Sequence, residues 1–468
     1  MSDPKGFYIY KKLPVWMQNC ACSIAGIEMR RKRYNKAFYN ALDFLEKSQQ
    51  WSLEELRFYQ NEQLQKIILH AYNTVPYYNQ LFHNLNLTPD DIKTVDDLSK
   101  LPVLERETVR KRFHEFQSRN WPQKRIVYGY TGGTTGAALT ITSDIDTAPW
   151  QWAIWWRHRR RFALKLNDPF IAFAGRTVIP LEKLTPPFWR RNLPMHQTYV
   201  SIHHMTKQNM PYLVDYLQKR KVVYYSGYPS ALYLLASWLL ENNISLQYPP
   251  RITVTGAETV LPHQRAVIEK AFKTKLADQY GASEHCGNIS ECQYHTYHID
   301  MEFGVIELLE IDRELPNLRR IICTGFRNPV MPLVRYNIGD VATVSNKKCP
   351  CGRALPVVER IDGRIESYIL TPDGRQLGRL DFLFKHSENI QEAQLIQNTQ
   401  DRVTVRIVKN ASYNEIDQAK LLTDMRKYLG DQIEIDVEYV PEIPREPNGK
   451  FRQIVSHVFY DKFRNANP

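Results

Sequence analysis

A run of glycine and threonine in the first third of the chain has the composition of a phosphate-binding loop. It comprises Thr131, Gly132, Gly133, Thr134, Thr135 and Gly136. Glycines let backbone N–H groups approach anionic oxygens closely, and threonine hydroxyls donate further hydrogen bonds without adding bulk. The run lacks the Gly-Lys-Ser/Thr ending of a Walker-type loop. Taken alone, such a run is more often an ordinary turn, so its meaning depends on the residues that follow it.

Two later segments combine glycine with a carboxylate. The first is Gly256, Ala257 and Glu258, and the second contains Tyr280, Gly281 and Glu284. A carboxylate is a hard oxygen ligand that suits Mg²⁺, and an aromatic face can cover a nucleotide base. Glu284 by itself could equally be a surface charge. The two segments are therefore candidate positions for a ligand site.

Lys450 ends the segment Pro444-Arg-Glu-Pro-Asn-Gly-Lys450. Where two anions come together in a reaction, a cation must offset the charge that builds up in the transition state. A lysine can supply that charge. A lone lysine is normally a solvated side chain, so this role depends on the motif around it.

Three cysteines and a histidine could form a metal site: Cys292, His298, Cys349 and Cys351. Three thiolates and one imidazole suit tetrahedral Zn²⁺ in a closed structural site. The spacing is less diagnostic than paired Cys-x-x-Cys motifs, and Cys286 or His295 could replace one ligand. Seven cysteines in 468 residues are too few for a disulfide scaffold, so reduced, unliganded thiols are the alternative.

The segments that carry these residues alternate between strand and helix patterns. Strands are predicted over residues 170–174, 222–225, 252–255 and 275–279, with helices up to about residue 242 and over 262–272. This alternation is typical of a doubly wound α/β core. Ligands of such sheets bind beyond the carboxyl ends of the strands. Gly256 to Glu258 and Tyr280 to Glu284 fall at such ends.

The patterns before and after this core differ from it. Residues 1–120 read as a helical layer, in which Ser52 and Glu55 form a capping box. Beyond Arg364, strand patterns over 402–408 and 433–440 flank a helix pattern over 414–428. We therefore predict a large α/β domain over residues 1–364 and a small α+β domain over residues 365–468.

Composition limits the classes of partner. Hydrophobic residues make up 43% and charged residues 24%, as in soluble globular proteins. The net charge of +12 could attract anionic ligands, although a solvated basic face is the simpler explanation. No nucleic-acid module accompanies the charge, so no nucleic acid is expected. The apolar segment from Leu13 to Ile27 is shorter than the roughly 20 residues of a membrane span. We expect a cytoplasmic protein, and contact with a membrane surface stays open.

Taken in order, these segments resemble the motifs of the acyl-adenylate-forming superfamily. Arg335-Tyr-Asn-Ile-Gly-Asp340 and Gly363-Arg364 are similar to the family's later nucleotide motifs. The resemblance implies that the Gly/Thr loop binds phosphate and that Gly256 to Glu258 lie beside the adenine. It further implies the following roles: Tyr280 and Gly281 near the adenine, Glu284 on Mg²⁺, Asp340 on the ribose, Arg364 on the nucleotide, and Lys450 as the lysine of adenylation.

The same resemblance implies a hinge two residues after the arginine. Family members commonly place Asp there, and this chain has Glu366. The family's small domain is mobile: it delivers the lysine for adenylation and then rotates to open a channel for the acceptor. The expected cofactors are ATP and Mg²⁺, with CoA as co-substrate and Zn²⁺ in a structural role.

Within the superfamily, the chain most resembles the phenylacetate-CoA ligase-like branch and its capsular-polysaccharide biosynthesis (CapK-type) relatives. Segments such as Leu13-Pro-Val-Trp16 and Val75-Pro-Tyr-Tyr78 carry this likeness, and Cys349-Pro-Cys-Gly resembles a segment found in this branch. The expected function is activation of a carboxylic acid as acyl-AMP, followed by acyl transfer to CoA. One alternative acceptor is an amine or hydroxyl of a sugar or lipid-linked sugar. Another alternative is an inactive, basic membrane- or nucleic-acid-binding protein.

Overall fold

The computed structural model describes residues 4–130, 139–180, 183–311, 317–344, 347–364, 368–372, 376–378, 389–445 and 451–458. Three of the predicted site features lie outside these ranges: the loop from Thr131 to Gly136, the hinge residue Glu366, and Lys450. The chain divides into two compact units. The first comprises Met1–Val260 and Gln264–Ile361, and the second comprises Leu261–His263 and Asp362–Pro468.

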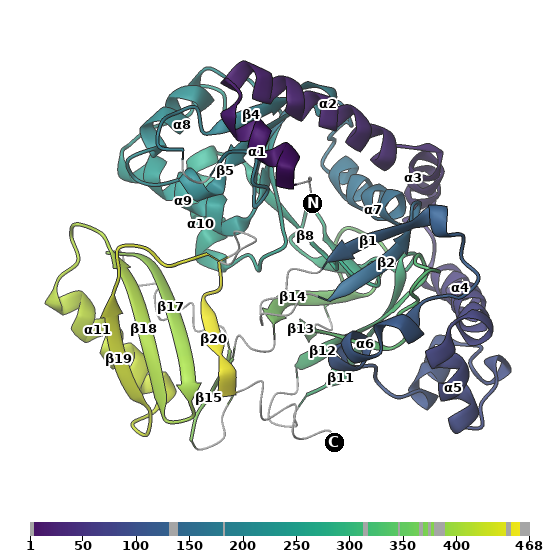
Figure 1. The fold of residues 1–468 in the computed structure, drawn as a ribbon. Helices are drawn as coiled ribbons and strands as arrows, with labels where there is room; N and C mark the ends of the chain where they lie inside the picture. The colour runs from purple at the N-terminus through teal and green to yellow at the C-terminus, as the bar shows by residue number, and fades with distance from the viewer. Residues whose placement is uncertain are drawn as a thin grey trace. The chain divides into compact units, whose positions relative to one another are not determined.

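Helices dominate the N-terminal part of the first unit (Figure 1). They are α1 (Pro4–Lys12), α2 (Val15–Arg33), α3 (Lys36–Ser48), α4 (Leu53–Thr74), α5 (Pro76–Asn84) and α6 (Arg106–Lys111). The capping box predicted for α4 is confirmed, because the Ser52 hydroxyl accepts from the Glu55 N–H and the Glu55 carboxylate accepts from the Ser52 N–H. This exchange satisfies two backbone donors that the start of a helix leaves unpaired.

A twelve-stranded sheet, counted over the described residues, forms the centre of the first unit. Its parallel core has the order β8–β7–β6–β3–β5, with β3 (Phe170–Ala174), β5 (Gln197–Ser201), β6 (Tyr224–Gly227), β7 (Ile252–Gly256) and β8 (Lys275–Gly281). The crossover helices α9 (Pro229–Glu241) and α10 (Pro262–Phe272) join β6 to β7 and β7 to β8. The doubly wound α/β core is thus present.

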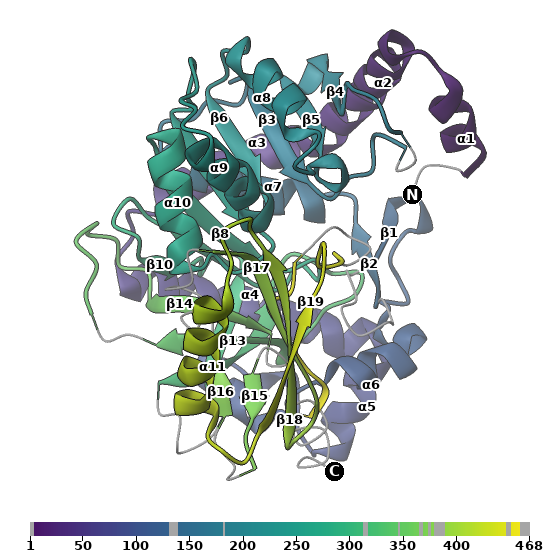
Figure 2. The same ribbon diagram turned by 90° about the vertical axis from the view of Figure 1, so that its left-hand side faces the viewer.

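Helices cover both faces of this core (Figures 1 and 2). The helices α8 (Met210–Gln218), α9 and α10 pack on one face around Tyr225 and Leu276. The helices α3 and α7 (Thr147–Arg161) pack on the other face around Tyr224 and Ala277. Neighbouring residues of one strand point to opposite faces, so each strand contributes apolar side chains to two cores.

Antiparallel strands extend the sheet on both sides of the parallel core. They are β4 (Trp189–Asn192), β9 (Asn288–Glu291), β10 (Tyr297–Ile299), β11 (Gly304–Glu310), β12 (Leu318–Gly325), β13 (Tyr336–Val344) and β14 (Val357–Arg364). A separate hairpin consists of β1 (Ile126–Tyr130) and β2 (Thr140–Asp144). The extension places β13, which carries Asp340 of the motif from Arg335 to Asp340, in the same sheet as β8.

The second unit has its own sheet and core. Its strands β17 (Ile390–Thr399), β18 (Arg402–Lys409), β19 (Glu434–Tyr439) and β20 (Ile454–Ser456) pair in the order β19–β18–β17–β20. The helix α11 (Glu415–Leu429) packs Leu421 and Met425 against Val405 and Ile407. A hairpin of β15 (Tyr368–Leu370) and β16 (Gln376–Gly378) precedes them. The unit is therefore α+β, as the sequence predicts.

Candidate active site and metal centre

The carboxyl ends of β7 and β8 lie side by side, because Gly256 pairs with Gln279 in the parallel register. A Cβ atom on Gly256 would come within 2.8 Å of the Gln279 carbonyl oxygen, so only glycine fits there. The next residue, Ala257, has a left-handed backbone with φ of 70°. The turn after β7 is therefore tightly constrained, and Glu258 is the residue that follows it.

Glu258 is held by the start of α9. Its Oε2 accepts a hydrogen bond of 3.1 Å from the backbone N–H of Ser230, in the first turn of that helix. The unpaired N–H groups and partial positive charge of a helix N-terminus stabilise a carboxylate there. The predicted segment from Gly256 to Glu258 is thus anchored to two elements of the sheet core.

Tyr280 and Asp340 meet across 60 residues of sequence. The Tyr280 hydroxyl donates a hydrogen bond of 2.7 Å to Oδ2 of Asp340. Tyr280 lies near the end of β8 and Asp340 lies in β13, and both side chains are half-buried. The resemblance assigns one residue to the adenine and the other to the ribose, and the structure brings the two into direct contact.

Asn337 and Glu105 support the irregular stretch of β13 that presents Asp340. The Asn337 amide donates to both carboxylate oxygens of Glu105, at 3.2 and 3.0 Å, and its Oδ1 accepts from the Gly339 N–H at 3.1 Å. Gly339 itself has a φ of 82°, which an L side chain adopts only with strain. Burial raises the pKa of Glu105, and the Asn337 hydrogen bonds partly offset that rise.

Glu284 is almost fully buried, with 4% of its side chain exposed, and it pairs with Arg106 at the start of α6 at 3.3 Å. The surface-charge interpretation of Glu284 is therefore wrong. The residue is a buried carboxylate at the β8 end of the site, and α6 delivers a cation to it. Arg364 is the last residue of β14 and belongs to the second unit.

Asp278 lies two residues before Tyr280 in β8 and is buried. Its carboxylate accepts hydrogen bonds from Thr255 in β7 at 2.6 Å and from Tyr297 in β10 at 2.9 Å. Burial, followed by the nearby charge of Glu291, raises the pKa of Asp278 to about 6. This carboxylate thus links β8 to β7 and to β10.

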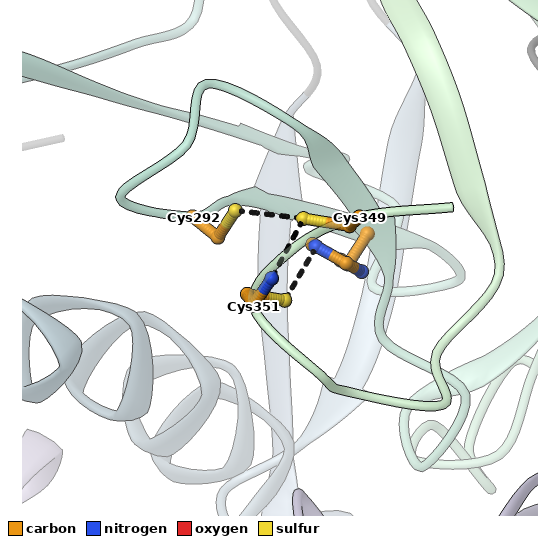
Figure 3. Close-up of side chains that lie close together, drawn as sticks. Cys292, Cys349 and Cys351 are labelled. Atoms are coloured by element: carbon orange, nitrogen blue, oxygen red, sulfur yellow. Dashed lines mark hydrogen bonds between the residues drawn. The ribbon is translucent and has the colours of Figure 1, made fainter. Parts of the chain in front are cut away.

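The four predicted metal ligands form a compact cluster (Figure 3). Their ligand atoms all lie within 4.8 Å of one another. Sγ of Cys292 is 3.5 Å from Sγ of Cys349, and Sγ of Cys351 is 3.3 Å from Nε2 of His298. Ligand atoms around tetrahedral zinc are separated by about 3.3 to 3.8 Å, given bond lengths of about 2.0 to 2.3 Å. The cluster has the size and the donor set of a closed zinc site.

Neighbouring groups favour the protonation states of these side chains that bind a metal. Nδ1 of His298 lies 3.2 Å from the carbonyl oxygen of Leu355, so an Nδ1–H donated to it leaves Nε2 free to bind a metal. Burial lowers the pKa of His298, which favours the neutral, ligating imidazole. Burial raises the pKa of Cys349, but hydrogen bonds from Thr296 and Cys351 outweigh this effect and lower it overall. The thiolate form that a metal requires is thereby favoured at Cys349.

Positive charge accumulates beside the cluster. On α7, Arg157 binds Asp300 and Glu302 at 2.5 Å each. Arg161, one turn further on, is 2% exposed and 4.0 Å from Asp300. Among the described residues, both terminal nitrogens of Arg161 and two nitrogens of Arg353 have no hydrogen-bond acceptor. The charges of Arg161 and Arg353 both lower the pKa of His298, so positive charge lies close to the cluster.

The two alternative ligands have other partners. Cys286 hydrogen-bonds Cys323 in the core, and this contact together with burial raises its pKa well above the usual value. His295 lies 3.1 Å from Glu291 and 2.9 Å from Arg265 through Nδ1. Within the described ranges, the cluster consists of the four ligands first assigned to it. Neither alternative belongs to it.

Sequence reasoning missed Arg106, Glu105 and the supporting role of Asn337. Asn337 lies inside the motif from Arg335 to Asp340, so the motif that identified Asp340 also contained a signal for Asn337. Arg106 and Glu105 belong to a short, polar segment with no pattern of its own. Their contacts to Glu284 and Asn337 span 178 and 232 residues of sequence, and only the folded sheet brings them together.

In the part of the chain that the structure covers, we find no helix long and apolar enough to cross a membrane.

Comparisons with known proteins agree with this architecture. Residues 369–457 match the model of the CapK C-terminal domain. Protein CapK of Staphylococcus aureus is 27% identical over 467 residues, covering 96% of this chain and 99% of that protein. The phenylacetate-coenzyme A ligase of Aromatoleum evansii is 33% identical over 343 residues, covering 70% of this chain and 74% of that enzyme.

Solved structures show the same fold. A 2-hydroxyisobutyryl-CoA ligase in the postadenylation state superposes with a TM-score of 0.67 at 15% identity, covering 90% of this chain and 93% of that one. The anthranilate CoA ligase AuaEII with anthranoyl-AMP superposes with a TM-score of 0.51 at 13% identity, covering 87% and 80%. On the sequence match to the Aromatoleum evansii enzyme, the chain belongs to the phenylacetate-coenzyme A ligase family and is an adenylate-forming ligase.

Proposed function

We propose that this protein activates a carboxylic acid with ATP and then transfers the acyl group to CoA. A carboxylate oxygen of the acid attacks the α-phosphorus, the bond to the β-phosphate oxygen breaks, and pyrophosphate leaves. The sulfur of CoA then attacks the acyl carbonyl carbon and releases AMP. The observation that carries the proposal is the 2.7 Å hydrogen bond between Tyr280 of β8 and Asp340 of β13, which brings two of the family-like motifs together.

The chain's own residues fit these steps. Tyr280 would cover the adenine, Asp340 would accept hydrogen bonds from the ribose, and Thr131 to Gly136 would bind the phosphates through backbone N–H groups. Bound at Glu284, Mg²⁺ would neutralise phosphate charge. Lys450 would stabilise the charge that develops at the α-phosphate. Each assignment follows from the motifs and can be tested by substitution.

Pyrophosphate release tests the proposal. The purified protein is assayed with ATP, Mg²⁺ and a panel of aryl, fatty, hydroxy, amino and sugar acids, with and without CoA. At least one acid should trigger release, CoA should accelerate turnover, and Lys450→Ala should lower the rate at least about a hundredfold, since electrostatic stabilisation of this kind is worth several kcal/mol. Lys347→Ala, in the first unit, serves as the control. ATP binding without release for any acid would instead favour an inactive binding protein.

A second acceptor is favoured by one observation. The similarity to protein CapK extends over 96% of this chain and 99% of that protein, whereas the phenylacetate-coenzyme A ligase of Aromatoleum evansii aligns with 70% of this chain. The acyl group could accordingly pass to an amine or hydroxyl of a sugar or lipid-linked sugar in surface-polysaccharide biosynthesis. If acyl-AMP forms but CoA gives no thioester, and a sugar acceptor is acylated instead, this alternative replaces the first.

We also propose that Cys292, His298, Cys349 and Cys351 bind one structural Zn²⁺. Three thiolates leave a bound Zn²⁺ with one net negative charge, and burying such a charge is costly unless a cation compensates it. Arg161 and Arg353 provide that cation, with buried N–H groups that lack acceptors in the described part of the chain. The positive charge of Arg161 and Arg353 would therefore offset the net negative charge of the zinc-loaded site.

Zinc content measured by mass spectrometry tests the metal proposal. One zinc per chain is expected, and Cys351→Ser should lose most of it, whereas Cys20→Ser, at an exposed cysteine outside the cluster, should retain it. Acidification should release zinc, because protons compete for the thiolates and for His298. A chelator should also lower the midpoint of thermal unfolding. Equal zinc content in both variants would contradict the assignment.

A further inference from the structure

We propose that the outward face of α2, together with Leu193, docks on an anionic lipid bilayer. Four large apolar side chains form this surface, which we call the α2 face: Trp16, Ile24, Ile27 and Leu193. They are 66%, 69%, 60% and 62% exposed. Large apolar side chains that cluster outside the core mark an interaction surface more often than scattered ones do. The inference does not depend on the proposed function, and its test requires no turnover.

The spacing of these residues makes them one surface. At 100° per residue, Trp16, Ile24 and Ile27 fall within about 80° of one another around the helix axis. The opposite side of α2 is buried. Gln18 accepts a 2.6 Å hydrogen bond from Arg190 of β4, and a Cβ atom on Gly26 would collide with the side chain of Asn192. The helix therefore cannot turn its apolar stripe toward the core.

Leu193 lies beside this stripe. Its backbone N–H donates to the hydroxyl of Ser23 on α2 at 3.2 Å, and the N–H of the neighbouring Arg191 donates to Asn19 at 2.9 Å. Figures 1 and 2 show α2 at the outer edge of the first unit, with β4 along one side of it. The α2 face thus joins a helix and the end of a β-strand into a single outward surface.

Exposed cations surround the α2 face. Lys12 precedes the helix, Arg31 and Lys32 stand in its last turn, and Arg191 borders Leu193. Glu28 pairs with Lys32 at 2.5 Å and is the acidic residue of α2. Apolar side chains bordered by cations, with a tryptophan among them, suit the interface of an anionic membrane.

A second copy of the chain is a less suitable occupant. A two-fold contact through the α2 face would bring its own cations toward their symmetry mates, and like charges repel. Anionic headgroups would neutralise the same cations, while the apolar side chains enter the boundary between headgroups and acyl chains. Charge complementarity therefore selects a lipid surface over self-association.

Vesicle co-sedimentation tests the proposal. The full chain should bind vesicles that contain phosphatidylglycerol, bind pure phosphatidylcholine weakly, and dissociate as salt is raised. The triple substitution Trp16→Ser/Ile24→Ser/Ile27→Ser should weaken binding roughly tenfold or more. Arg31→Gln/Lys32→Gln should weaken it by on the order of thirtyfold, taking about 1 kcal/mol per basic residue near the surface.

The matched control is Leu53→Ser/Phe58→Ser/Leu69→Ser on α4, where the side chains are also exposed. It should bind vesicles like the unmodified protein, and unchanged far-ultraviolet circular dichroism shows that each variant is folded. Equal binding of the α2 variant and the α4 control would overturn the proposal. So would absence of binding to anionic vesicles at low salt. If the α2 variant converts a dimer to a monomer in sedimentation equilibrium without affecting vesicle binding, the surface is a self-association interface instead.

Discussion

The Tyr280 hydroxyl donates a hydrogen bond of 2.7 Å to Oδ2 of Asp340. Sequence motifs place one residue on the adenine and the other on the ribose, but they cannot show that the two side chains touch. The hydroxyl of Tyr280 fixes one carboxylate oxygen of Asp340, so it holds the group that would bind the ribose. We interpret Tyr280 as both a platform for the base and a positioning residue for the aspartate.

Tyr280→Phe should raise the KM for ATP about tenfold and leave kcat within about twofold. The substitution keeps the aromatic face and removes one hydrogen bond to a charged group, which is worth about 1.5 kcal/mol. Steady-state kinetics with an active acid gives both parameters. Tyr294→Phe, at an exposed tyrosine, is the control. An unchanged KM for ATP would show that the bond does not position Asp340.

A cluster of cysteines and histidine was predictable from residue types, because three thiols and an imidazole form the donor set of a tetrahedral zinc site. The sequence left open which of Cys286, Cys292, His295 and His298 take part. The folded sheet resolves this choice, since β9 and β10 pair and bring Cys292 and His298 to the Cys349–Cys351 turn. The countercharge from Arg161 had no sequence signal, because it depends on how α7 packs against β9.

At the scale of elements, the predicted bounds agree with the observed ones where the local sequence pattern is strong. Phe170–Ala174 and Pro262–Phe272 have the predicted bounds, because apolar runs and a proline at the first helical position are strong signals. The strand β9 was not predicted. Its sequence Asn-Ile-Ser-Glu reads as a loop, yet all four residues are buried. Partners distant in sequence, including Asp300 and Arg265, satisfy their polar groups.

Asp278 links three strands, and its titration gives this part of the sheet a pH dependence. Burial and the charge of Glu291 raise its pKa from 3.8 to about 6. The folded state then binds this proton more tightly than the unfolded state does. The resulting contribution to the free energy of unfolding is fully present below pH 3.8 and is lost as the pH rises through about 6. Its full size is on the order of 3 kcal/mol.

Urea unfolding of the native protein and of Asp278→Asn between about pH 4.5 and pH 7.5 measures this contribution. The native protein should lose stability relative to the variant as the pH rises, because the asparagine side chain does not titrate. The difference between the two proteins should level off above about pH 7. A constant difference across the range would show that Asp278 does not titrate there.

At the scale of the whole molecule, the residues to which the family resemblance assigns a role fall in two units. Glu284 and Asp340 belong to the first unit, whereas Arg364 and Lys450 belong to the second. The shift in pattern after Arg364 indicated two parts. No local pattern specifies how the parts approach each other, because that depends on a few residues between them and on bound ligands. The domain bounds and the hinge at Glu366 accordingly remain predictions about a moving enzyme.

The identity of the acid is also a property of the whole molecule. A binding pocket forms from segments that meet only after folding, and the motifs shared by the family hold the nucleotide rather than the acyl group. Tyr228, which follows β6, illustrates the point, since its ring packs against the core and an aromatic residue can pack a core or contact a ligand equally well. The formal charge of +12 suits an acceptor with phosphates, but charge alone does not distinguish CoA from other phosphorylated acceptors.

The most direct test of the central claim is exchange of labelled pyrophosphate into ATP in the absence of CoA. This exchange reports the first half-reaction alone, since it requires acyl-AMP to form and to react backwards. Exchange that depends on a carboxylic acid, falls with Asp340→Ala and disappears with Lys450→Ala is the result we predict. If ATP is cleaved to ADP and phosphate, or if no acid supports exchange although the protein binds ATP, the protein is not an acid-activating enzyme of the kind proposed.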